Sequence, residues 1–190
     1  MDGHLIQILI MIALLAMSSF FSATETSFSA LNRTRLKNMA EKGNKRAAAA
    51  LKLSENYDSL LSSILVGNNI VNISLASIGT VLFVGLMGSS SGPTVSTIVC
   101  TVVVLIFGEI TPKSIAKEMP ESFAMAVTPI MRVLLVILKP INAIFSGWKK
   151  LLCRVFHFEN DRTFSQDELL TLVDEVQQEG GMNEDEGDLL

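Results

Sequence analysis

The sequence has two long stretches without fixed charge. Apart from the titratable His4, no charged residue lies between Gly3 and Thr24, and none lies between Ser59 and Gly108. Stretches of about 20 or more uncharged, mostly apolar residues are long enough to cross a bilayer. The mean hydropathy of +0.44 agrees, because soluble domains are usually less apolar. A membrane protein is therefore predicted.

The signatures of several other classes are also lacking. The two cysteines, Cys100 and Cys153, have neither a paired spacing nor a metal-ligand neighbour, so we interpret both as packing residues. No basic region precedes the first apolar stretch, which we expect to remain as a span and not to be cleaved as a signal peptide. No nucleophile and base, phosphate-binding loop or nucleic-acid patch is recognisable. Neither an enzyme nor a nucleic-acid-binding protein is predicted.

The apolar stretches predict an all-α membrane protein with three transmembrane helices. The first span is predicted at about 5–31. Small residues from Gly88 to Pro93 form a predicted loop that divides the second uncharged stretch into spans at about 57–87 and 94–112. The sequence therefore predicts one transmembrane domain that covers residues 1–150.

Basic residues predict the orientation of the spans. Segment 32–56 is predicted as a helical hairpin with its turn at residues 41–44, and it carries seven lysines and arginines: Arg33, Arg35, Lys37, Lys42, Lys45, Arg46 and Lys52. The loop at residues 88–93 carries none. Because loops rich in Lys and Arg stay in the cytoplasm, the amino terminus is expected outside and the carboxyl terminus inside the cell.

A fourth apolar region, residues 123–148, is predicted as a belt helix of about 121–150 at the membrane surface. Prolines and basic residues interrupt it, namely Pro129, Arg132, Lys139 and Pro140. A full crossing would carry the basic residues after it to the outside, against the charge rule. The alternative is a fourth span kinked at Pro129, since membrane helices tolerate proline.

The composition reverses after the belt region. From Glu159 onward, eleven acidic residues accompany one base, Arg162. Ser165 and Glu168 have the spacing of a capping box, and Gly180 and Gly181 follow the helix that it starts. We therefore expect acidic cytoplasmic linker helices over residues 151–190, and a further cytoplasmic domain after them.

Polar residues reach a common depth in the three predicted spans. At about 1.5 Å of rise per residue, Ser22, Asn69 and Glu109 each lie roughly 24–27 Å from the outer end of their span. Glu109 is the strongest candidate for a site, because a carboxylate deep in an apolar helix is costly without a partner or an ion. Its neighbour Gly108 permits close backbone approach, and Pro112 is expected to free the Gly108 carbonyl for a ligand. The alternative is that this segment ends the span with Glu109 in water.

Further candidates surround these residues. Asn68 and Asn72 share one face of the second span, and Asn69 is displaced by about 100°. In the first span, Ser18, Ser22 and Glu25 share a face. Packing and hydrogen bonding between helices are the alternative roles of the serines and asparagines. Glu25 has a further alternative, because it could pair with one of two basic residues that follow it, Arg33 or Arg35.

The candidate ligands are oxygen atoms. Carboxylate, amide, hydroxyl and carbonyl oxygens suit hard cations such as Mg²⁺, Ca²⁺ or Na⁺, and they do not suit zinc or copper. The sequence therefore predicts a cation site between the three spans.

Four segments carrying these residues resemble the transmembrane domain of the CorC/CNNM family of magnesium transporters. They occur in the order of the family and comprise Phe20–Thr26, Leu31–Leu36, Gly67–Asn72 and Gly108–Lys113. The acidic helix at residues 164–180 is similar to the family linker that leads to cytoplasmic CBS domains. The resemblance covers nearly the whole chain.

The resemblance implies a homodimer in the cell membrane, with three spans and a belt helix in each subunit. It implies a largely dehydrated Mg²⁺ held by Ser22, Asn69, Asn72, the Gly108 carbonyl and Glu109, with Asn68, Glu25 and Ser18 as weaker candidates. It also implies Mg²⁺ export coupled to Na⁺, and regulation by CBS domains outside this chain. The alternatives are a membrane-anchored Mg²⁺ sensor or regulatory scaffold that moves no ion, and a purely structural anchor.

Overall fold

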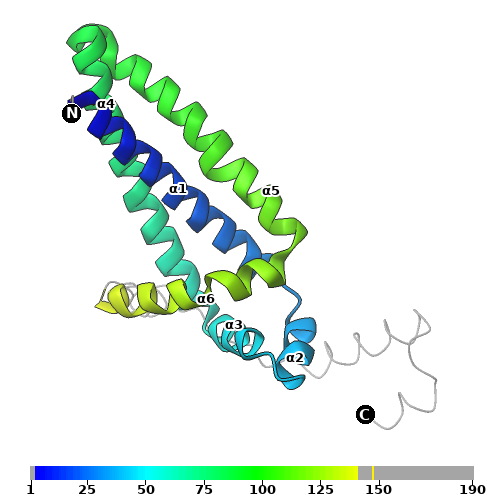
Figure 1. The fold of residues 1–190 in the computed structure, drawn as a ribbon. Helices are drawn as coiled ribbons and strands as arrows, with labels where there is room; N and C mark the ends of the chain where they lie inside the picture. The colour runs from blue at the N-terminus through cyan, green and yellow to red at the C-terminus, as the bar shows by residue number, and fades with distance from the viewer. Residues whose placement is uncertain (1–2, 141–146, 148–190) are drawn as a thin grey trace, which may run out of the picture. The chain divides into compact units, whose positions relative to one another are not determined.

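Every described element is a helix (Figure 1). The computed structural model describes residues 3–140 and residue 147, and the chain divides into two units, Met1–Phe145 and Ser146–Leu190. All the elements with described bounds belong to the first unit. The predicted linker helices at 151–190, and the predicted belt helix beyond residue 140 apart from Gly147, lie outside the described residues.

Helix α1 (Gly3–Ala30) has 28 residues, which corresponds to a length of about 42 Å. Its first half exposes large apolar side chains such as Leu9 and Ile12, whereas Phe21 and Phe28 in its second half are buried. Exposed apolar side chains along a whole helical face are costly in water and favourable in lipid. The sequence of α1 thus suits a helix with one end in lipid and the other in a protein core.

Helix α4 (Tyr57–Val103) contains a reversal at Gly88, which has a φ of +79° that residues with a side chain rarely adopt. We call residues 57–87 the first arm and residues 89–103 the second arm; Figure 1 shows them as a hairpin. A Cβ atom on Gly92 would lie 2.7 Å from Val84 Cα, so the backbones touch just below the turn. The predicted loop at 88–93 is too long, because one glycine reverses the chain and the second arm starts directly after it.

The second arm continues without a break through a π-helix, η1 (Val104–Ile110), into α5 (Thr111–Glu118). The helix therefore continues past residue 112, where the third span was predicted to end, and ends at Glu118; where it leaves the membrane stays a prediction. Three described segments are long and apolar enough to cross a membrane, namely Gly3–Ala30, Tyr57–Glu118 with its two arms, and Pro120–Ile137. The predicted fold class, an all-helical protein with three long apolar helices, is confirmed.

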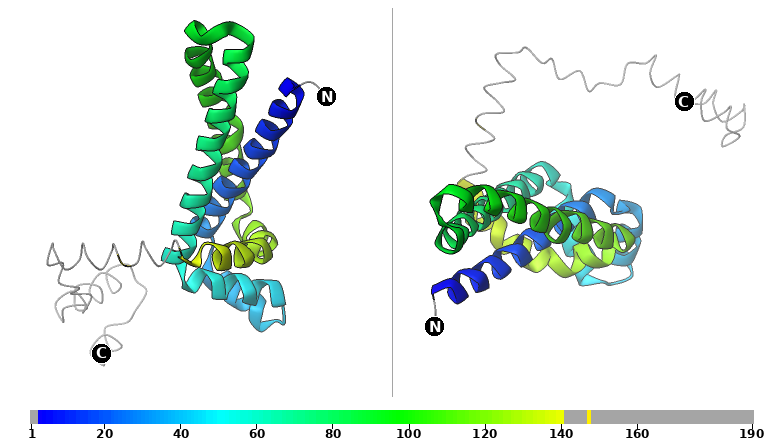
Figure 2. Two further views of the ribbon diagram at one scale, coloured as in Figure 1. Left: turned by 90° about the vertical axis from the view of Figure 1, so that its left-hand side faces the viewer. Right: turned by 90° about the horizontal axis from the view of Figure 1, so that it is seen from above.

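Two short helices form a hairpin at the end of the arms opposite Gly88 (Figure 2). Asn32 caps α2 (Arg33–Glu41) and Asn44 caps α3 (Lys45–Glu55), each by accepting hydrogen bonds from the first turn. The turn between them places Gly43 at a φ of +90°. Leu36, Ala47 and Ala50 form a small core between the two helices.

Helix α6 (Pro120–Ile137) runs across the lower ends of α1 and the first arm (Figures 1 and 2). Its buried residues Ala124, Val127 and Met131 join the main core, together with Phe21, Phe28, Leu53, Leu60, Ile64 and Val71 of α1, α3 and the first arm. A helix laid across the end of a bundle has the geometry of the predicted belt. Whether it lies at the membrane surface stays a prediction.

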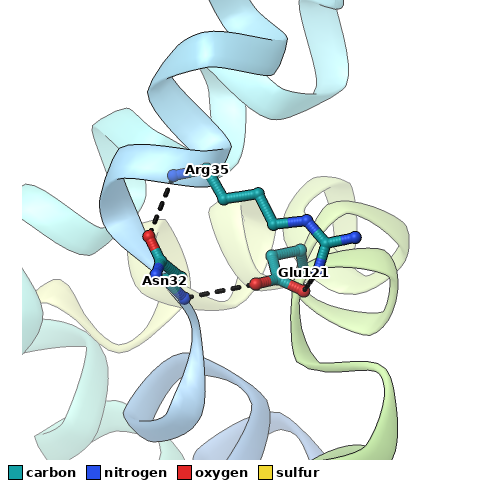
Figure 3. Close-up of polar contacts among 3 residues, drawn as sticks. All are labelled: Asn32, Arg35 and Glu121. Carbon is teal, nitrogen blue, oxygen red and sulfur yellow. Dashed lines mark hydrogen bonds and ion pairs between the residues drawn. The ribbon is translucent and has the colours of Figure 1, made fainter.

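Glu121 in the first turn of α6 connects this helix to the start of α2 (Figure 3). Its Oε1 accepts a hydrogen bond from the Asn32 backbone N–H at 3.3 Å, and its Oε2 lies 3.6 Å from Arg35 Nη1. Glu121 is buried, whereas the Arg35 side chain is 71% exposed. The partly buried hydrogen bond should therefore stabilise the junction more than the exposed ion pair does.

Replacing Glu121 with alanine is expected to cost about 1–3 kcal/mol of stability, because the Asn32 N–H loses a charged acceptor. Replacing Arg35 with alanine is expected to cost less than about 1 kcal/mol, because a largely exposed ion pair is screened by water. Thermal unfolding of the two variants in the same detergent measures this difference. Equal losses of stability in the two variants would contradict the prediction that the hydrogen bond to Asn32 contributes more than the ion pair with Arg35.

Candidate cation site

Helix α1 and the first arm touch at the level where polar residues interrupt both. Ser18 Oγ donates a hydrogen bond to Asn68 Oδ1 at 3.2 Å. Next to this bond, a Cβ atom on Gly67 would lie 2.5 Å from the end of the Phe21 ring, so only glycine permits this approach. The two helices run in opposite directions, as Figure 1 shows, and this contact fixes their register.

The π-helix brings the second arm to the same level. The Thr111 N–H bonds to the carbonyl of Ile106, five residues earlier. By the same offset, the carbonyl of Phe107 would need the N–H of residue 112, which is a proline and has none. The Ser19 hydroxyl donates to the Phe107 carbonyl at 2.6 Å instead. The Phe107 carbonyl therefore takes its hydrogen bond from another helix, and the role of the Gly108 carbonyl as a ligand stays a prediction.

Gly108 contributes to the contact through its lack of a side chain. It is buried, and a Cβ atom on it would lie 3.0 Å from Ser18 Oγ. Three chain segments thus meet at one level, marked by Ser18, Asn68 and Gly108. The sequence placed a common depth at Ser22, Asn69 and Glu109, each within one helical turn of these residues.

Among the described residues, two buried side-chain oxygen atoms have no hydrogen-bond partner, Ser22 Oγ and Asn72 Oδ1, and both lie near this level. Hydroxyls elsewhere in α1 and α4, such as those of Thr24 and Ser74, donate to the carbonyl four residues earlier. An unpaired buried polar atom costs about 1–3 kcal/mol. A cation or a water molecule bound at these oxygens would remove that cost.

The two unpaired oxygens lie on opposite sides of the Ser18–Asn68 bond. Ser22 follows Ser18 by four residues, and Asn72 follows Asn68 by four residues. Because α1 and the first arm are antiparallel, these two steps run in opposite directions along the helix axes. Each step is about 6 Å along the helix axis, so Ser22 and Asn72 are separated by about 12 Å in depth. Ligands of one Mg²⁺ lie about 2.0–2.1 Å from the metal. This conformation therefore offers oxygens at successive depths, and it does not gather Ser22 and Asn72 into one shell.

The remaining predicted ligands differ in exposure. Asn69 is exposed on the first arm, whereas Asn68 and Asn72 are half-buried. Glu109 is half-buried and follows directly after Gly108. Among the described residues, the salt bridges join Arg35 to Glu121 and Lys113 to Glu25, and Glu109 takes part in neither. The carboxylate nearest the common level is thus not neutralised by a salt bridge in this part of the chain.

Glu25 has a different partner from those considered in the sequence. Its Oε2 lies 3.2 Å from Lys113 Nζ on α5. Arg33 donates to the Ser54 carbonyl, and Arg35 pairs with Glu121. The alternative that Glu25 pairs with Arg33 or Arg35 is therefore wrong, because the π-helix and α5 bring a closer cation to it.

The groups near this level are neutral oxygens and one carboxylate, and oxygen ligands of this kind suit hard cations. No group of three His, Cys, Asp or Glu side chains occurs in residues 3–140, so a borderline-soft metal such as zinc has no ligand set there. Sequence reasoning missed Ser19 and Lys113. Ser19 lies beside Ser18 on the polar end of the helix, but its partner becomes visible only with the π-helix.

The fold and this site define a helical membrane domain with a polar contact between three apolar segments. Residues 9–186 match the model of the Cyclin M transmembrane N-terminal domain, CNNM, and the chain belongs to this family. It is 36% identical over 162 residues to the UPF0053 inner membrane protein YfjD of Escherichia coli K12, covering 83% of this chain and 38% of that protein.

Two further relatives extend the comparison. A UPF0053 protein of Haemophilus influenzae is 37% identical over 171 residues, with 88% of this chain and 40% of that protein covered. The Polyamine export protein of Escherichia coli K12 is 27% identical over 197 residues, with 96% of this chain and 44% of that protein covered. The chain thus spans about two fifths of the length of these relatives.

Proposed function

We propose that this domain transports Mg²⁺ across the cell membrane, in the direction of export and coupled to Na⁺. The observation that carries the proposal is Glu109, a carboxylate beside the common level that takes part in no salt bridge of the described residues. A negative charge in an apolar segment calls for a cation. The resemblance to CorC/CNNM proteins supplies Mg²⁺ and Na⁺ as the candidates.

The spread of oxygens along the helix axis favours transport over static binding. Asn72 lies on the Gly88 side of the Ser18–Asn68 bond and Ser22 on the opposite side, and their unpaired oxygens can hold a cation at successive depths. Movement requires several weak sites in place of one closed cage. Ser22, Asn69, Asn72, the Gly108 carbonyl and Glu109 are the proposed ligands along this path.

The proposed orientation has the amino terminus outside and the carboxyl terminus in the cytoplasm. The basic hairpin α2–α3 lies at the end of the arms opposite Gly88, as Figure 2 shows, and basic segments stay inside the cell. We further propose a homodimer, with CBS domains in the remaining part of the full-length protein. The greater length of the relatives leaves room for such domains.

The test is Mg²⁺ flux in liposomes that contain the purified protein and a Mg²⁺ indicator. The indicator signal is expected to change when a Na⁺ gradient and a Mg²⁺ gradient are imposed, and to stay constant in liposomes without protein. Polyamines belong in the same assay, because one relative is a polyamine export protein. Flux of polyamine without flux of Mg²⁺ would show that the proposed cargo is wrong.

A Mg²⁺ sensor without transport is the second candidate, because the same oxygens would serve both roles. Binding of Mg²⁺ without flux under any gradient would support the sensor. A lack of any specific divalent binding would support a structural anchor, in which Ser18 and Asn68 serve only to join the helices.

A further inference from the structure

A half-open cavity of about 220 Å³ lies between the two arms of α4, and polar side chains from both arms interrupt its mostly apolar lining. The first arm contributes Asn72 and Thr80, and the second arm contributes Ser96, Thr97 and Thr101. The rest of the lining is Leu75, Ala76, Cys100 and Val104. None of the lining residues carries a fixed charge.

The oxygens of this cavity are available as acceptors. Thr80 and Thr97 donate their hydroxyl protons to the carbonyls of Ala76 and Pro93, which leaves the oxygen lone pairs free. Asn72 Oδ1, one of the two buried oxygens without a partner, belongs to the same lining. These oxygens can bind water or the water shell of a cation, without the charge needed to strip that shell from Mg²⁺.

The cavity leads from the common level toward the turn at Gly88. Thr80 and Ser96 are each eight residues from Gly88, or about 12 Å, and Asn72 is sixteen residues from it, or about 24 Å. The lining also includes Val104, the first residue of the π-helix that carries Gly108 and Glu109.

A second cavity of about 240 Å³ provides an internal comparison. It lies between α1 and the arms and is lined by apolar residues together with Cys100. Val99 and Val103 of the second arm line this cavity, whereas Thr97 and Thr101 line the first. Cavities lined by apolar side chains stay dry. The second arm therefore has a wettable face and a dry face at the same depths.

We propose that the polar cavity is a water-filled vestibule that takes a hydrated cation on its way between Asn72 and the Gly88 end of the hairpin. This inference rests on the proposed function, since it gives the transported cation its route to the outer side. The hydroxyl oxygens bind the water shell of the cation, and Asn72 Oδ1 is the first protein oxygen that the cation meets at the inner end.

Cysteine reactivity tests the vestibule. Four single cysteines are introduced into a background of Cys100→Ala and Cys153→Ser, namely Thr97→Cys, Thr101→Cys, Val99→Cys and Val103→Cys. A membrane-impermeant, positively charged methanethiosulfonate reagent is added to proteoliposomes, and the rate of modification is measured. Because the thiolate reacts and forms only where water reaches the sulfur, the two Thr positions are expected to react at least about tenfold faster than the two Val positions.

Mg²⁺ is expected to slow the modification of the Thr97 and Thr101 cysteines, because the bound cation and the reagent compete for the same space. Equal rates of modification at the Thr and Val positions would contradict the proposal that water fills the cavity. Fast modification that Mg²⁺ does not slow would contradict the proposal that a cation occupies it. Circular dichroism of the four variants verifies that each is folded. The cysteines at positions 97 and 101 could react fast and be slowed by Mg²⁺ while the liposome assay shows no flux. That result would contradict the proposed transport and would still support a hydrated cation site in the cavity.

Discussion

Replacing Glu109 with glutamine is expected to abolish the stabilisation that Mg²⁺ gives to the purified protein, while the protein stays folded. Glutamine keeps the size of the side chain and removes the negative charge, which no salt bridge of the described residues offsets. A ligand at about 100 times its Kd stabilises a protein by about 2.7 kcal/mol. The variant should lose this whole amount, measured as the shift of the unfolding temperature on adding Mg²⁺.

The matched control is Glu118→Gln, which removes a carboxylate from the exposed end of α5. Its Mg²⁺-dependent shift is expected to equal that of the unmodified chain. An unchanged shift in Glu109→Gln would remove this residue from the site. A loss of the shift in both variants would indicate general attraction of Mg²⁺ to acidic residues, and no specific site.

Replacing Gly67 with alanine is expected to destabilise the protein by about 1–3 kcal/mol, the usual cost of overfilling a packed core. The new Cβ atom would lie 2.5 Å from the Phe21 ring, and Phe21 is 4% exposed among the residues of the main core. The ring belongs to the main core, which also contains Phe28 and Leu60, so it has little free space in which to move. The higher helix propensity of alanine offsets at most about 1 kcal/mol.

Two controls distinguish the clash from a general effect of removing glycine. Gly3→Ala is expected to have little effect, because nothing lies within 4 Å of its added Cβ atom. Combining Gly67→Ala with Phe21→Leu should cost less than the sum of the two single changes, since the smaller side chain leaves space for the Cβ atom. Strict additivity in thermal unfolding would contradict the close contact.

The sequence predicted the helices better than it predicted their ends. Uncharged stretches identify α1 and both arms of α4, because a span must be apolar along its whole length. The end of the third span was placed at residue 112, since proline normally interrupts a helix. A π-helix changes the hydrogen-bond offset at that point, and Ser19 of another helix supplies the missing donor for Phe107. No local pattern reveals a donor that comes from 88 residues away.

The candidate site, too, could be predicted from the sequence only in part. Counting residues from the ends of the spans brought a serine, an asparagine and the Gly108–Glu109 pair to one depth, because helical rise is constant. It could not distinguish Asn68, which bonds to Ser18, from Asn69, which is exposed, since a rotation of about 100° per residue decides which face meets α1. That rotation depends on how α1 and the first arm pack.

The stretches without charge, from which the membrane class was inferred, are a property of composition and need no tertiary structure. The sequence by itself therefore determined an all-helical membrane domain and a basic hairpin, and it predicted a set of candidate oxygen ligands at similar depth. Only the tertiary structure decided that Lys113 neutralises Glu25, that Ser22 and Asn72 lie on opposite sides of the Ser18–Asn68 bond, and that polar side chains of both arms line one half-open cavity. These features depend on helix register and rotation, which are set by contacts between residues far apart in the chain.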